Sequence, residues 1–168
     1  LTILNVSRAK IDSVLYDSYN DNDLRKSIFF KSNNNGSYQF KGDYNGTGTS
    51  SGYVFGGIVA DEIYLIKAEC FARKGMTDEA MEALNKLMKK RWAKAFFSPL
   101  TASDSREALL KILEERRKEL LFRGLRWTDL RRFRNDPDLS VVPKRLYNGD
   151  SYTLLPESAR YTLQIPIN

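Results

Sequence analysis

The chain has 168 residues, a formal net charge of +6, 42% apolar residues and 29% charged residues, a composition typical of a globular domain that can bury a core. It contains no histidine and one cysteine, Cys70, which excludes histidine-based catalysis, histidine metal sites, thiolate metal clusters and internal disulfides. No apolar run approaches the roughly 20 residues of a membrane-spanning helix, and the first residues do not have the pattern of a signal peptide.

The excess of positive charge is concentrated in one stretch. Residues 106–134 hold ten Lys or Arg and five Asp or Glu, whereas residues 1–60 hold six and five. Most of the basic residues in the rich stretch have an acidic residue within one helical turn, which is the pattern of a helix with paired charges. We therefore expect no nucleic-acid partner.

The first part of the chain, residues 1–58, is polar and rich in Asn and Gly, which favours loops over 33–37 and 46–52. Short elements are expected before, between and after these loops. They are a helix over 11–19, a helix or a strand over 24–31, and strands over 38–41 and 53–55.

The second part, residues 60–134, has strong helical periodicity. Caps and glycines predict four helices: from Asp61 to Gly75, from Thr77 to near Arg91, from Ser103 or Ser105 to Gly124, and from Arg126 to Phe133. In the first of these helices Ile63, Ile66 and Cys70 recur at helical spacing, and Tyr64, Ala68 and Phe71 form an adjoining row. We expect Cys70, which lies inside this apolar pattern, to be a buried and unreactive thiol.

The first two of these helices also fit one tetratricopeptide-like pair, in which a helix, a turn glycine and a second helix follow one another. One such pair cannot bury both of its faces alone, so it needs neighbouring helices. Residues 138–168 read as an irregular tail that ends in an apolar segment over 161–167. The sequence thus predicts a single domain over 1–168, mainly α, with a tetratricopeptide-like helix pair, long helices, and irregular loops and short strands packed on them.

The run from Glu115 to Arg132 interleaves charged and apolar residues, and Glu114 precedes it. Glu119 and Arg123 are four residues apart, as are Glu114 and Lys118, and such pairs stabilise a helix by about 0.2–0.5 kcal/mol each. Glu115 and Glu119 share a face, but a basic residue lies within one turn of each, so we interpret them as structural and not as an acid–base pair.

The residues that follow Gly124 are also interpreted as structural. We expect Trp127 to pack in the core rather than to stack on a sugar. Asp129 has three candidate partners, Arg126, Arg132 and Arg134, among which the sequence does not choose.

Six motifs follow one another along the chain in a fixed order. They are Asn22-Asp23-Leu24-Arg25, Tyr64-Leu65 followed by Ala68-Glu69, Leu84-Asn85, Glu115-Arg116-Arg117-Lys118-Glu119-Leu120, Gly124-Leu125-Arg126-Trp127-Thr128-Asp129-Leu130-Arg131-Arg132, and Ile165-Pro166-Ile167. In this order and spacing they resemble the C-terminal part of the SusD/RagB family, surface lipoproteins that capture nutrients for a TonB-dependent transporter. Arg123, Leu125 and Thr128 depart from the residues common in the family, which leaves the fold expectation intact.

The resemblance implies a non-catalytic protein that binds a glycan or another nutrient. It would sit on the cell surface at the outer membrane, with a TonB-dependent transporter as its partner. Family members attach to the membrane through a lipid anchor on an N-terminal cysteine, and that anchor is absent from this chain. Neither a cofactor nor a metal is implied. The alternative is a generic helical-repeat module that binds another protein, while no nucleophile motif argues for an enzyme.

Three loop tyrosines are the candidate ligand-binding residues: Tyr38, Tyr44 and Tyr53. Tyrosine rings match the apolar faces of sugar rings, although the same side chains can instead anchor the loops on the helices. The glycine-rich stretch around Gly48 is not followed by the Lys-Ser/Thr of a phosphate loop. The stretch that begins at Asp17 lacks the central Gly and closing Glu of a calcium loop.

Overall fold

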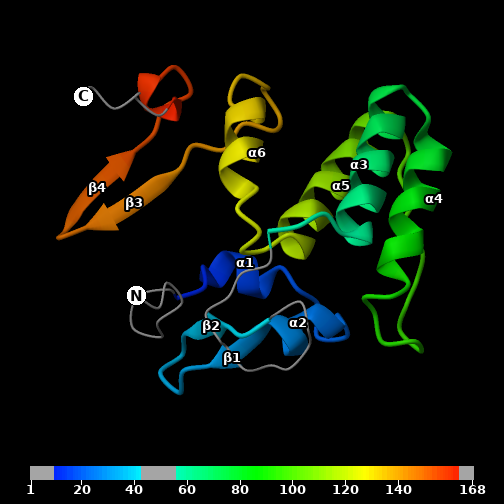
Figure 1. The fold of residues 1–168 in the computed structure, drawn as a ribbon, viewed down its shortest axis with the longest axis horizontal. Helices are drawn as coiled ribbons and strands as arrows, with labels where there is room; N and C mark the ends of the chain where they lie inside the picture. The colour runs from blue at the N-terminus through cyan, green and yellow to red at the C-terminus, as the bar shows by residue number, and fades with distance from the viewer. Residues whose placement is uncertain (1–9, 43–55, 163–168) are drawn as a thin grey trace. The chain divides into compact units, whose positions relative to one another are not determined.

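The computed structural model describes residues 10–42 and 56–162 (Figure 1). The expected strand over 53–55, the loop over 46–52 and most of the apolar segment 161–167 lie outside these residues. The chain divides into two compact units, Leu1–Arg123 and Gly124–Asn168, each described below by itself. The single domain over 1–168 stays a prediction.

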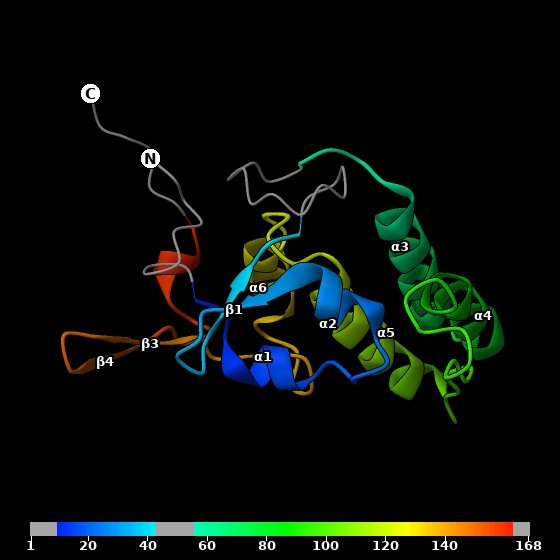
Figure 2. The same ribbon diagram turned by 90° about the horizontal axis from the view of Figure 1, so that it is seen from below.

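Three helices form the framework of the first unit: α3 (Ala60–Arg73), α4 (Thr77–Met88) and α5 (Ser105–Glu119). Figures 1 and 2 show α3 beside α4, and α3 also packs against α5. The prediction of a mainly α fold with a tetratricopeptide-like helix pair is confirmed, because α3 and α4 are that pair and α5 supplies the neighbouring helix.

The ends of these helices follow from local chemistry. Gly75 has a φ of +78°, the left-handed conformation that glycine adopts without strain, and it separates α3 from α4. Asp104 caps α5 by accepting a hydrogen bond from the backbone N–H of Glu107 (2.8 Å), so α5 begins at Ser105. The side chain of Asn85 clamps the loop before α5 through two 2.8 Å hydrogen bonds to the backbone of Leu100.

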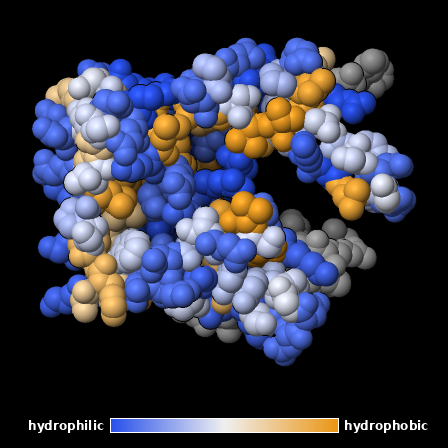
Figure 3. Space-filling model, turned by 180° about the vertical axis from the view of Figure 1, so that it is seen from behind, coloured by the Kyte–Doolittle hydropathy of each residue, from blue (hydrophilic) through white to orange (hydrophobic). Residues whose placement is uncertain are grey.

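Of the two apolar rows predicted on α3, only Ala68 lies on the buried face. Ile63, Ile66 and Cys70 are exposed, and the buried face carries Leu65, Ala68, Glu69 and Ala72. Both faces of α3 hold apolar residues, and the face with two alanines is the one that lets α4 and α5 approach closely. The expectation of a buried Cys70 fails for the same reason. Apolar residues show at the surface as separate patches among hydrophilic ones (Figure 3).

A smaller layer precedes the framework in the first unit. It holds α1 (Ser13–Asp17), α2 (Leu24–Phe29), β1 (Phe30–Ser32) and β2 (Tyr38–Phe40). The strands are antiparallel, with Phe30 opposite Phe40. The stretch 24–31, for which the sequence left helix and strand open, contains both in succession.

This layer has its own small core, in which Leu15, Tyr19 and Phe30 are buried and Leu121 packs against them from the end of α5. The ring of Phe40 stacks on Phe122 with centroids 4.7 Å apart. The strands are therefore anchored to the residues that follow α5.

The second unit holds α6 (Arg126–Phe133), the antiparallel strands β3 (Lys144–Tyr147) and β4 (Asp150–Thr153), and a short 3-10 helix, η1 (Ala159–Tyr161). The tail is thus more regular than the sequence analysis expected. Asn148 and Gly149 connect the strands with φ of +52° and +88°, and this pair with two positive φ angles is the usual turn of a tight hairpin.

Glu107, in the first turn of α5, is expected to make the stability of the fold depend on pH. Hydrogen bonds from Lys111 and from the backbone and hydroxyl of Ser103 lower the pKa of Glu107 to about 2. A depressed carboxyl pKa stabilises the fold above pH 4.5, and this stabilisation disappears as the pH falls through about 2. We expect a carboxyl-carbon NMR titration to place the Glu107 midpoint near 2. In Lys111→Gln it moves toward 4.5, and an unchanged midpoint would contradict this assignment.

Candidate functional site

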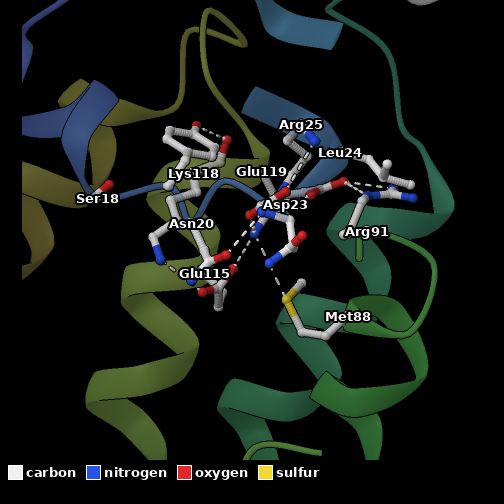
Figure 4. Close-up of polar contacts among 12 residues, drawn as sticks. Ser18, Asn20, Asp23, Leu24, Arg25, Met88, Arg91, Glu115, Lys118 and Glu119 are labelled. Atoms are coloured by element: carbon white, nitrogen blue, oxygen red, sulfur yellow. Dashed lines mark hydrogen bonds and ion pairs between the residues drawn. The ribbon is translucent and has the colours of Figure 1, made fainter. Parts of the chain in front are cut away.

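The central polar feature of the first unit is a buried arginine surrounded by three carboxylates (Figure 4). Arg25, in the first turn of α2, is 2% exposed. Its Nη2 lies 2.6 Å from Asp23 Oδ2 and 2.6 Å from Glu115 Oε2, and its Nη1 lies 3.1 Å from Glu119 Oε2. Asp23 also caps α2 by accepting the backbone N–H of Arg25 at 3.0 Å.

Two further cations surround this centre. Arg91, which follows α4, places Nη2 2.6 Å from Glu119 Oε1, and Lys118 Nζ lies 2.9 Å from Glu115 Oε1. The backbone carbonyl of Arg91 accepts the N–H of Leu24 at 2.8 Å. The cluster therefore joins α2, α5 and the end of α4, and we call it the Arg25 cluster. Its members are Asp23, Arg25, Arg91, Glu115, Lys118 and Glu119.

The charges of the Arg25 cluster balance, with three cations and three carboxylates. Burial alone lowers the pKa of Arg25, but hydrogen bonding to Asp23 and the charges of Glu115, Asp23 and Glu119 outweigh it and raise that pKa above its ordinary value. Burial likewise lowers the pKa of Lys118, and the charge of Glu115 and the hydrogen bonds to both neighbouring glutamates raise it overall. Both cations stay charged, which is the state that the surrounding carboxylates require.

The structure corrects the interpretation of the charged run in α5. Lys118 does pair with Glu114, at 2.9 Å, as its spacing predicts. Glu115 and Glu119, however, reach across to Arg25 on α2, and Glu119 also reaches Arg91. The face is therefore bound to other elements and not only to itself. The signal for this was the Asp-x-Arg step at Asp23, which the sequence analysis used for resemblance alone.

The candidate ligand surface lies on the small layer. The rings of Tyr16 and Tyr38 stack with centroids 3.6 Å apart and an interplanar angle of 13°, and both are half-buried. Phe30 meets Tyr16 edge to face at 5.3 Å, and Lys26 Nζ lies 5.0 Å from the Tyr16 centroid. Hydrogen bonding with Tyr38 raises the pKa of Tyr16 to about 12, so the phenol of Tyr16 is neutral at ordinary pH.

Of the three predicted ligand residues, the structure places only Tyr38. It lies in β2, stacked on Tyr16, a residue that the sequence analysis missed because it falls in a helix rather than in a loop. Tyr44 and Tyr53 lie outside the described residues. Through this stack Tyr38 anchors β2 to α1, and its ring is still partly exposed.

In the second unit, Trp127 is less buried than expected. It is 38% exposed and stacks on Tyr161, with centroids 5.5 Å apart. Asp129 pairs with Arg132, one of the three candidates from the sequence: Arg132 Nε lies 2.9 Å from Asp129 Oδ1. This ion pair lies within α6, so it supports the helix.

Two further observations concern chemistry and membranes. Within residues 10–42 and 56–162, no group of His, Cys, Asp or Glu side chains is arranged to hold a metal ion, and the three buried carboxylates converge on Arg25 instead. In the same residues, no helix combines the length and the apolar character needed to cross a bilayer.

Removal of Arg25 is expected to destabilise the protein strongly, because Asp23, Glu115 and Glu119 would stay buried without their shared cation. Arg25→Met should lower the free energy of unfolding by about 3–5 kcal/mol in urea denaturation. Lys86→Met, which breaks the exposed Lys86–Glu82 pair (2.8 Å), is the matched control and should leave the midpoint unchanged. Equal midpoints for both variants would show that the cluster does not hold the fold.

Comparison with known proteins gives the family. No curated protein matches the chain. A solved SusD superfamily protein from Bacteroides fragilis NCTC 9343 is 24% identical, with a TM-score of 0.56 over 73% of this chain and 29% of its own. A solved SusD-like carbohydrate binding protein from Bacteroides vulgatus ATCC 8482 is 23% identical, with a TM-score of 0.57 over 94% of this chain and 39% of its own.

These likenesses show a shared fold, and the chain spans less than half of the length of either structure. The model of the SusD family matches residues 33–162, which is more than half of the chain. The matched range includes Glu115 and Glu119 of the Arg25 cluster, the Trp127 step and the β3–β4 hairpin. The chain therefore belongs to the SusD family.

Proposed function

We propose that this chain is part of a non-catalytic glycan-binding protein that serves nutrient uptake at the outer membrane. Its family membership supports this proposal, as does its likeness in fold to a protein described as a SusD-like carbohydrate binding protein. The observation that carries it is the Tyr16–Tyr38 stack, a partly exposed pair of aromatic rings beside a lysine.

The proposed binding step is stacking of a sugar ring on the face of Tyr38 that Tyr16 does not cover. Tyr16 covers one face of Tyr38 and meets Phe30 in a T-shaped contact, so the platform is held in place before a ligand arrives. The backbone carbonyl of Tyr38 also accepts the N–H of Ile11 at 2.9 Å. A preformed platform loses little entropy on binding.

Polar groups next to the stack supply hydrogen bonds to sugar hydroxyls. Lys26 Nζ lies 2.7 Å from Asp21 Oδ1, and the side chains are 19% and 92% exposed, so a largely buried donor lies beside an exposed acceptor. Capture and release then require only stacking and hydrogen bonds, and no bond in the glycan is broken.

The wider setting belongs to the same proposal. We propose that the whole protein lies on the outer face of the outer membrane, held by a lipid anchor, with a TonB-dependent transporter that receives the glycan. The resemblance to the SusD/RagB family is the support for these three points.

A protein-binding helical-repeat module is the second candidate function, and one observation favours it. Ile63 and Ile66 are exposed on the face of α3 that neither α4 nor α5 covers. A chain that binds no glycan would favour this reading.

Affinity gel electrophoresis of the 168-residue chain tests the leading proposal. Gels that contain amylopectin, xylan, galactomannan or polygalacturonate should include at least one that retards the native chain. Tyr38→Ala should weaken that retardation about tenfold, which corresponds to ~1.4 kcal/mol. Tyr64→Ala removes a partly exposed tyrosine on α3 and should have no effect.

Two results would contradict the proposal. One is normal mobility of the native chain in all four polysaccharides. The other is release of reducing ends when the pure chain is incubated with a polysaccharide that retards it, since this would make the protein a hydrolase.

A further inference from the structure

The β3–β4 hairpin carries a second aromatic surface, in the other compact unit. Arg145 pairs with Tyr152 and Tyr147 pairs with Asp150 across the two strands. Side chains alternate along a strand, and directly paired residues point to the same side, so these four residues share one face. We call it the tyrosine face of the hairpin. The opposite face carries Lys144, Leu146, Ser151 and Thr153.

On the tyrosine face, aromatic and charged residues alternate in both directions. Tyr147 and Tyr152 are diagonal neighbours, a position in which side chains come within about 7–8 Å of one another. They are 56% and 50% exposed. The guanidinium of Arg145 lies 5.8 Å from the centroid of Tyr147, and Asp150 is exposed beside it.

This combination suits a sugar better than it suits an apolar partner. A pyranose ring presents an apolar face to an aromatic ring, while its hydroxyls both donate and accept hydrogen bonds. Arg145 only donates and Asp150 only accepts, so the two charges next to the rings complement hydroxyls of either role. The opposite face of the hairpin has no aromatic ring and lacks this complementarity.

The hairpin backbone holds the four side chains in register. Asn148 and Gly149 form a tight turn at one end with two positive φ angles. At the other end, the carbonyl of Pro143 accepts the N–H of Leu154 at 3.0 Å. The two rings are therefore presented together without a ligand, which reduces the entropy lost on binding.

We propose that the tyrosine face of the β3–β4 hairpin is a second glycan-contact surface, which stacks a sugar unit on Tyr147 and Tyr152 and bonds its hydroxyls through Arg145 and Asp150. The inference rests on the proposed glycan-binding function. It adds a contact in the second unit to the Tyr38 platform proposed in the first.

The test uses the full 168-residue chain in the same four polysaccharide gels. The first variant is Tyr147→Val with Tyr152→Val, which removes both rings and keeps strand propensity high because valine is β-branched. The second is Tyr147→Phe with Tyr152→Phe, which keeps the rings. The matched control is Leu146→Val, at a residue that is 75% exposed on the opposite face of the same hairpin.

In the polysaccharide that retards the native chain, we expect the double valine variant to bind about tenfold more weakly. The double phenylalanine variant should bind within about twofold of the native chain, and Leu146→Val should bind as the native chain does. Circular dichroism should give the same spectrum for all four proteins.

Three outcomes would overturn the proposal. Native-like retardation of the double valine variant would show that the tyrosine face does not contact the glycan, and it would leave the proposed glycan-binding function in place. An equal loss in Leu146→Val would show that binding does not depend on the tyrosine face. Absence of retardation of the native chain by any of the four polysaccharides would overturn the hairpin surface and the proposed function together.

Discussion

The buried guanidinium of Arg25 is the constraint on which the first unit depends. A fully desolvated cation is tolerated only where carboxylates surround it, and Asp23, Glu115 and Glu119 do so at 2.6–3.1 Å. Two of these acids lie on α5, and the third caps α2. The ion cluster therefore fixes where α2 meets the helical framework. The hydroxyl of Tyr19, which donates to the carbonyl of Lys118 at 2.8 Å, adds a second tie beside it.

This arrangement separates the scaffold from the proposed binding surfaces. Carboxylates in the charged run of α5 form ion pairs with Arg25 and Arg91, and these pairs hold α5 to other elements. The Tyr16–Tyr38 stack lies on the small layer that the cluster holds against α5. In the second unit, the hairpin presents its own tyrosines on a backbone closed by a tight turn. In the stack and in the hairpin, helices and strands hold the aromatic rings in place before a ligand binds. A binding surface that is preformed in this way loses less entropy when the ligand arrives.

The helices between residues 60 and 134 could be predicted from their apolar periodicity and from the glycine at residue 75, which ends α3. The predicted caps Asp61 and Thr77 were wrong, because α3 and α4 begin after Val59 and Met76 without a side-chain cap. Asp104, which does cap α5, was not singled out from the sequence. The buried face of α3 could not be predicted, because both of its faces are apolar and only packing against α4 and α5 chooses between them. The pairing of Arg25 with Glu119 could not be predicted from the sequence either, since the two residues are 94 positions apart. The hairpin was different: Asn148-Gly149 is a strong turn signal that the composition of the tail obscured.

A double-mutant cycle between Arg25 and Glu119 tests most directly whether the Arg25 cluster is the organising contact. Unfolding free energies would be measured for the native chain, Arg25→Met, Glu119→Gln and the double variant. Residues in one buried ion network are expected to show a coupling energy of about 0.5–3 kcal/mol, so the double variant should lose less stability than the two single losses added together. Strictly additive losses would mean that the two residues stabilise the fold independently, and the account of the cluster would then be wrong.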